Sequence, residues 1–245
     1  MSNILHCLQL GESMRDRFLE EARSFPYGSA LFLVPNRYFQ QKIREKGVIR
    51  AATIDFLPQE ILRWNGGTPG FRPVNRPAQK KILQEALDYL EPHLDYFSSL
   101  VGKTGFRDNL LALFDEFSRD GLEPETFKEV LLSWNREEPL KNKDMDLVRL
   151  YTAYCFKLQE LGLEDLPRIY TRAAETLEEG GTIPWKKCYF SEFYQFDPVQ
   201  LRLLRALGRC CEVEVGLFYD PGRPALSQVT EKIYGDLVGA GFANL

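Results

Sequence analysis

The sequence predicts an α/β fold in which a parallel sheet is interrupted by a long helical insertion. The clearest part is segment 187–220, where an aromatic run (188–193) and an alternating apolar run (212–219) flank a helical pattern. Asp197 and Pro198 stand at the N-cap and the first position of that helix. A helix that crosses between two strands implies a parallel pair with a right-handed connection.

The first 65 residues predict a second part of such a sheet. Strand-like runs occur at 3–10, Ala30–Val34 and 48–53, and helical patterns separate them. The run Ala30–Val34 is apolar throughout, as in a strand that is buried on both faces of a parallel sheet. Ser13 is expected to cap the first helix, and Pro35 with Asn36 to open the second. This order is typical of a doubly wound fold.

The middle of the chain has a different character. Residues 66–77, GGTPGFRPVNRP, contain three glycines and three prolines and indicate a linker. Beyond them, up to about residue 184, no convincing strand is found. The helical patterns there are 79–90, 106–118, 124–134, 145–161 and 166–177. We therefore predict a discontinuous α/β domain of residues 1–65 and 186–245, with a helical insertion domain of residues 66–185.

Composition narrows the class of protein. A hydrophobic content of 44% with 13% aromatic residues predicts a packed core. The net charge of −4 gives no support to a broad electrostatic footprint for nucleic acid, although a local basic strip is compatible with it. The five cysteines form no CxxC pair, which favours buried reduced thiols. No apolar run is long enough to cross a membrane and the N-terminus does not resemble a signal peptide, so a cytoplasmic protein without membrane contact is expected.

Common catalytic and metal-binding patterns are not found in the sequence. Only two histidines occur, His6 and His93, and they are too far apart in the chain for an HxxxH metal motif. The sequence contains no GxSxG elbow for a serine nucleophile and no Cys/His metal set. We therefore predict no catalytic residue and no metal ligand in this chain.

Three short motifs follow one another along the α/β part. They are LFLVPNRYFQ (31–40), ATIDFL (52–57) and SEFYQFDPVQ (191–200). With the helical insertion, they resemble the first motor domain of superfamily 1 DNA helicases, and most of all the N-terminal part of AddB/RexB-type subunits of bacterial helicase–nucleases. The third motif departs at its first two positions from the D-G-F of that family. The resemblance implies a RecA-like (P-loop NTPase-like) domain.

The nucleotide site of that family is not present here in its expected form. A working phosphate loop needs glycines, a lysine and a Ser or Thr hydroxyl. Gly11 can be the remnant of the first glycine, but the lysine and the second glycine are missing. Ser191 and Glu192 stand where the family carries a magnesium-binding acid. The GKT at 102–104 follows a helical pattern, so we do not read it as a phosphate loop. No ATP or magnesium cofactor is expected.

DNA binding is what the resemblance implies for the strand-end loops. The candidates there are Asn36, Arg37, Thr53 and Phe56, and basic clusters on the insertion add Lys80 and Lys81. Arginine can contact phosphate, a hydroxyl can contact sugar or phosphate oxygens, and an aromatic ring can stack on a base. Each residue also has a structural alternative: a helix cap for Asn36, a strand end for Thr53, a core side chain for Phe56 and exposed helix faces for the lysines.

The sequence thus favours a helicase-like domain without catalysis of its own, from the B-type subunit of a recombination helicase–nuclease. Its expected roles are to hold single-stranded DNA and to dock a catalytic partner subunit. Two alternatives stay open at this point: an ATPase with a non-standard phosphate loop at Gly11, and a protein-interaction module that does not bind DNA.

Overall fold

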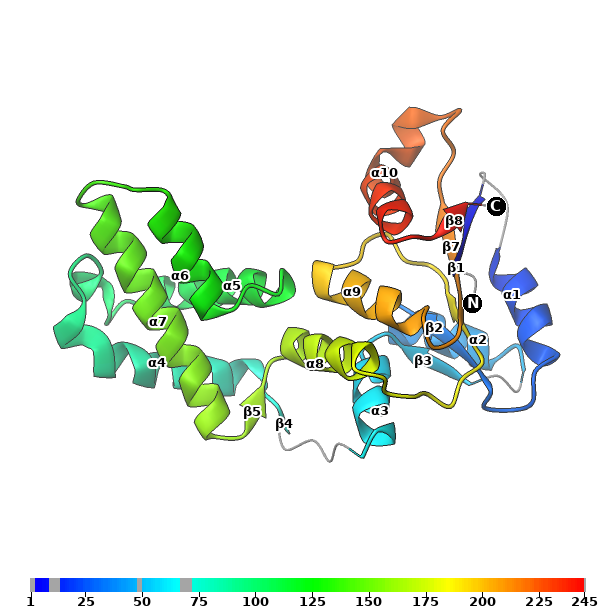
Figure 1. Cartoon of the computed structure of the whole chain (residues 1–245), viewed down its shortest axis with the longest axis horizontal. Helices are drawn as coiled ribbons and strands as arrows, with labels where there is room; N and C mark the ends of the chain where they lie inside the picture. The colour runs from blue at the N-terminus through cyan, green and yellow to red at the C-terminus, as the bar shows by residue number, and fades with distance from the viewer. Residues whose placement is uncertain (1–2, 9–13, 48–49, 67–71, 245) are drawn as a thin grey trace. The chain divides into compact units, whose positions relative to one another are not determined.

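The structure is a computed structural model that describes residues 3–8, 14–47, 50–66 and 72–244. The chain divides into two compact units, one of residues 1–69 and 170–245 and the other of residues 70–169 (Figure 1). The first contains the sheet and the second is almost entirely helical. From the sequence we predicted domain boundaries at 65/66 and 185/186. That these boundaries separate two domains stays a prediction.

A six-stranded parallel sheet forms the centre of the first unit. Its strands are β1 (Asn3–Leu8), β2 (Ala30–Val34), β3 (Ala51–Thr53), β6 (Lys187–Phe190), β7 (Glu212–Phe218) and β8 (Ala243–Asn244). They lie in the order β3-β2-β6-β7-β1-β8, and every neighbouring pair is parallel. Because β2 pairs directly with β6, the two predicted parts belong to one sheet. The predicted fold class is confirmed, and the strand order is consistent with a RecA-like domain.

Helices connect these strands. They are α1 (Met14–Arg23), α2 (Arg37–Arg44), α3 (Phe56–Trp64), α8 (Leu166–Glu178), α9 (Pro198–Leu207) and α10 (Pro224–Gly239), of which α8 begins in the second unit. Asp197 begins α9 as predicted, with its backbone N–H donating to the Gln200 side chain. The predicted cap Ser13 lies outside the described residues. Helix α10 and strand β8, which we did not predict, extend the fold beyond β7.

One face of the sheet packs against α1 and α2. Phe18 of α1 lies against Phe32 of β2 and Tyr189 of β6, and all three are fully buried. Gly216 of β7 permits this approach, since a Cβ there would lie 3.1 Å from Met14 and 3.2 Å from Phe18. Figure 1 shows α9 and α10 on the side of the sheet opposite to α1. The sheet is therefore covered on both faces, as the apolar run of β2 predicted.

The second unit is a helical bundle around an aromatic core. Its helices are α4 (Arg76–Leu90), α5 (Thr104–Arg119), α6 (Pro124–Ser133) and α7 (Leu140–Glu160), with short 3-10 helices η1 (Glu91–His93) and η2 (Ser98–Leu100). Phe114 of α5 packs against Tyr151 and Tyr154 of α7, with ring centroids 4.9 and 5.6 Å apart. Aromatic and aliphatic side chains on facing helices thus close this core.

Two expectations for the middle of the chain are wrong: the predicted linker 66–77 contains a short strand and the start of α4, and a second short strand lies between the linker and residue 184. Strand β4 (Arg72–Pro73) pairs in parallel with β5 (Leu163–Glu164). Each strand is only two residues long, so neither can show the alternation by which strands are recognised in a sequence. Their pairing depends on the fold bringing distant segments of the second unit together.

Candidate functional site

Three loops meet at the carboxyl edge of strands β3, β2 and β6. Val34 at the end of β2 is paired with Thr53 at the end of β3, and Leu33 is paired with Phe190 at the end of β6. Parallel strands end at the same edge of a sheet, where ligands of open α/β folds bind. The loops that follow these three strands contain most of the residues that the sequence analysis selected.

Asn36 and Arg37 follow β2. The side chain of Asn36 accepts a hydrogen bond of 3.2 Å from the backbone N–H of Phe39, so Asn36 is the N-cap of α2. Arg37 is exposed and has no ion-pair partner among the described residues. The structure therefore gives Asn36 a structural task and leaves the guanidinium of Arg37 open to solvent.

Thr53 and Phe56 follow at the end of β3. Both side chains are partly buried. The ring of Phe56 lies 5.3 Å from the guanidinium carbon of Arg50, in a cation–π arrangement. The hydroxyl of Tyr170 donates to the carboxylate of Asp55 at 2.8 Å. This hydrogen bond holds the short loop between Thr53 and Phe56. Phe56 is thus neither a core residue nor a freely exposed ring.

Two exposed aromatic rings lie on the same loops and were not selected from the sequence. Tyr38 in the first turn of α2 is 65% exposed, and Tyr194 in the loop after β6 is 57% exposed. Both stand in aromatic runs (RYF and SEFYQF) whose other members are partly or fully buried, as Phe193 is. The doublet of Tyr38 and Phe39 was a usable signal, because neighbours on a helix cannot both face the core.

The candidate lysines lie on α4, in the second unit. The ammonium of Lys80 lies 3.0 Å from the carboxylate of Asp108, and this hydrogen bond lowers the pKa of Asp108. Lys81 is exposed and lies 3.9 Å from Glu85, one helical turn along. Both charges therefore have local partners, as expected for exposed helix faces. Their role in DNA binding stays a prediction.

The remnant of the nucleotide site is held by backbone and ionic contacts. Ser191 is buried, and its backbone N–H donates to the carbonyl of Leu33 at 3.1 Å. Glu192 adopts left-handed backbone angles, with φ at 67°, and the run of β6 stops before it. Its carboxylate lies 3.8 Å from the guanidinium of Arg15, in the first turn of α1. Gly11, the third residue of this remnant, lies outside the described residues.

The charged side chains beside this remnant pair with one another. The carboxylate of Glu192, which would have to hold magnesium, has the cation of Arg15 as its partner. Next to Arg15, Asp16 is a carboxylate that would repel phosphates, and its pKa is lowered by a hydrogen bond from Lys46 at 2.5 Å. The charges of these four side chains are thus compensated within the chain.

The GKT sequence at residues 102–104 lies in the second unit. Lys103 precedes α5 and Thr104 begins it, so the GKT sequence stands at a helix start that follows a 3-10 turn instead of a strand. Within the described ranges, no three His, Cys, Asp or Glu side chains are grouped as metal ligands. Among the same residues, no helix is long and apolar enough to cross a membrane.

The chain is similar to one protein family and to three proteins that share one name. A family model described as "ADDB, N-terminal" matches residues 14–235. The chain is 28% identical over 169 residues to the B-type subunit of the ATP-dependent helicase/deoxyribonuclease of Carboxydothermus hydrogenoformans, in an alignment that covers 66% of this chain. It is 27% and 28% identical to the proteins of the same name in Bacillus velezensis and Bacillus subtilis, over 78% and 77% of its length. The chain spans 14–18% of the length of these relatives.

Proposed function

The chain belongs to the AddB N-terminal family, and from this membership we propose that it is a helicase-like domain that holds single-stranded DNA without catalysis of its own. The relatives carry the name of a helicase/deoxyribonuclease subunit, so the process that we propose is DNA double-strand-break repair and recombination in the cytoplasm. In this proposal the domain also docks a catalytic partner subunit.

The observation that carries the DNA proposal is the combination of one open cation and two exposed rings at a single sheet edge. Arg37 and Tyr38 follow β2, and Tyr194 follows the neighbouring strand β6. Single strands are held by cations that contact phosphates and by aromatic faces on which bases stack. Thr53, on the other neighbour of β2, adds a hydroxyl for sugar or phosphate oxygens.

Two observations support the absence of catalysis in the proposal. The acid that follows β6, Glu192, is paired with Arg15. The first lysine of the sequence is Lys42, which is too late for a phosphate loop after β1. In the proposal, the chain therefore holds neither ATP nor magnesium.

The experiment that tests DNA binding compares tyrosines of similar exposure. Fluorescence anisotropy with a labelled oligonucleotide should show Tyr38→Ala and Tyr194→Ala weakening the binding, each by about 1–3 kcal/mol. Tyr89→Ala is the matched control, since Tyr89 is 73% exposed on α4 and has no place in the proposed site. If the wild type fails to bind even at low salt, the chain is a protein-interaction module and the DNA proposal is wrong.

A further inference from the structure

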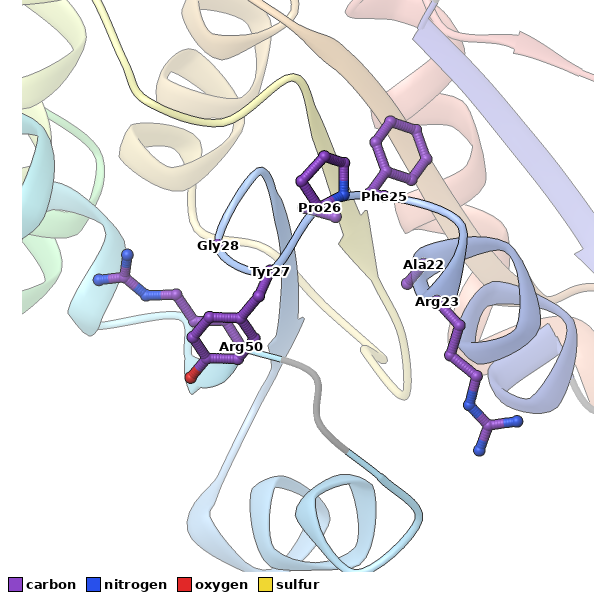
Figure 2. Close-up of a pocket in the computed structure, with 8 residues that line it drawn as sticks. Ala22, Arg23, Phe25, Pro26, Tyr27, Gly28 and Arg50 are labelled. Atoms are coloured by element: carbon purple, nitrogen blue, oxygen red, sulfur yellow. The ribbon is translucent and has the colours of Figure 1, made fainter.

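A cavity of about 420 Å³ lies at the edge of the sheet opposite to the loops described above. It is lined by residues that precede β2 and β3 and by the end of α1, hence it belongs to the amino edge (Figure 2). The lining is mainly apolar, with Ala22, Phe25, Pro26 and Tyr27, and it includes Arg23 and Arg50. Its volume falls within the range of about 300–1,000 Å³ that is usual for ligand pockets.

A tight turn presents the ring of Tyr27 at the rim of this cavity. The backbone N–H and the hydroxyl of Ser29 both donate to the carbonyl of Pro26, at 3.0 and 2.7 Å. Gly28 has a φ of 86°, a conformation that residues with a Cβ rarely adopt. Tyr27 lies between Pro26 and Gly28 in this turn and is 75% exposed. Tyrosine is among the residues that most often carry the binding energy of a protein interface.

The two arginines of the cavity differ in how they are compensated. Arg50 pairs with Glu60 at 3.1 Å and also lies 5.9 Å from the ring of Trp185. Arg23 donates to the backbone carbonyl of Lys46 at 2.7 Å and has no carboxylate partner among the described residues. Arg23 is therefore the cation of this cavity that is left for a ligand.

The lining of the cavity is also positive, because it contains Arg23 and Arg50. None of the residues that line the cavity is acidic. Figure 2 shows the guanidinium groups of Arg23 and Arg50 directed away from each other, so they do not form a clamp for one phosphate. An apolar hollow beside one open guanidinium suits a protein segment better than a nucleic-acid backbone.

We propose that this cavity docks an acidic peptide segment of a partner protein. One large apolar side chain of the segment enters the cavity beside Pro26 and Tyr27, and a carboxylate next to it pairs with Arg23. The surface lies at the other edge of the sheet from Arg37 and Tyr38, so this inference does not depend on the DNA proposal. Either can fail while the other holds.

A labelled synthetic peptide, Glu-Asp-Phe-Asp-Glu with blocked ends, is the probe for fluorescence anisotropy with the full chain. We expect a Kd on the order of 100 µM, as a single small site allows. Tyr27→Ala and Arg23→Gln should each weaken binding by about fivefold or more. Tyr89→Ala again is the matched control, with an exposure of 73% against 75% for Tyr27. A peptide with Ala for Phe should lose binding, and one with Asn and Gln for the acids should lose its salt dependence.

Three results would overturn the proposal. The first is that binding does not saturate up to about 2 mM peptide, and the second is that wild type and Tyr27→Ala bind the peptide equally well. The third is that an oligonucleotide displaces the peptide and that Tyr27→Ala weakens the binding of this oligonucleotide. The third would assign the cavity to a nucleic-acid surface. Oligonucleotide binding is measured on the same variants. Tyr27→Ala should leave oligonucleotide binding unchanged, so the failure of this proposal can be told apart from the failure of the proposed function. Thermal melting checks that the variants fold, which an exposed tyrosine should permit.

Discussion

The guanidinium of Arg15 lies 3.8 Å from the carboxylate of Glu192, and each side chain is 27% exposed. This ion pair joins the first turn of α1 to the loop after β6. Pairs of this exposure contribute only about 0–1 kcal/mol to stability. The importance of the pair lies in the charge of Glu192, because Arg15 compensates the acid that the sequence analysis placed in the remnant of a nucleotide site.

We expect this chain to have no ATPase activity of its own. Turnover with magnesium and single-stranded DNA should stay well below about 1 per second, the low end for typical enzymes. The reason is that Glu192 is engaged by Arg15 and that no lysine precedes Lys42. A coupled assay measures the rate, and Glu192→Gln is the control. A rate at or above that value that disappears in Glu192→Gln would contradict the prediction.

Arg37→Ala should weaken oligonucleotide binding to the same extent for every base sequence. Arg37 has no ionic partner among the described residues, so its proposed contact is with phosphate, which carries no base information. The slope of log K against log salt should decrease by roughly 1. A Lys80/Lys81 double alanine is the comparison, because those lysines have local partners. If only the double variant changes the slope, the DNA path lies on the helical unit instead.

Lys187→Met should destabilise the sheet unit by about 3 kcal/mol. Lys187 is 4% exposed, and its ammonium lies 2.5 Å from Glu214, next to Glu21. Removal of the ammonium takes the lysine charge away from the buried carboxylate of Glu214. Urea denaturation followed by circular dichroism measures the loss. The matched control is Lys186→Met, an exposed neighbour, which should change the free energy of unfolding by less than about 0.5 kcal/mol.

Glu214→Gln should reduce the acid sensitivity of folding. Burial would raise the pKa of Glu214, but hydrogen bonds from His6 at 2.8 Å and from Lys187 outweigh this and lower it. A carboxyl whose pKa is lower in the folded state contributes stability above its unfolded pKa, about 4.3, and loses it as pH falls through the folded value. The unfolding free energies of wild type and variant should therefore converge below about pH 4. A constant difference from pH 7 to pH 3 is incompatible with this.

Asp146→Ala should be among the most destabilising substitutions in the helical unit, at about 3–5 kcal/mol. The carboxylate of Asp146 is fully buried and accepts the backbone N–H groups of Asp95, Tyr96 and Phe97 at 2.7–3.2 Å. Without it these donors lose their partner. Hydrogen exchange at the three amides should accelerate, while Asp88→Ala, on the exposed face of α4, should leave their exchange unchanged.

The sequence by itself determined the elements whose signal is local. Ala30–Val34 is apolar along its whole length because both of its faces are covered, and this is readable without neighbours. Asn36 and Asp197 begin helices because a cap is a contact between residues three positions apart. The parallel α/β sheet followed from these elements, since a strand, helix and strand connect in only one common way.

Only the tertiary structure decided what depends on residues far apart in the chain. The pairing of β4 with β5, the contact of Arg15 with Glu192 and the cavity beside Tyr27 each bring together segments that no sequence pattern links. The exposure of Tyr194 is of the same kind, and so is the choice of Tyr38 over Phe39 as the exposed ring, because the packed core decides which aromatic residue stays outside. Local patterns follow from backbone geometry, whereas a site follows from which side chains the fold leaves without a partner.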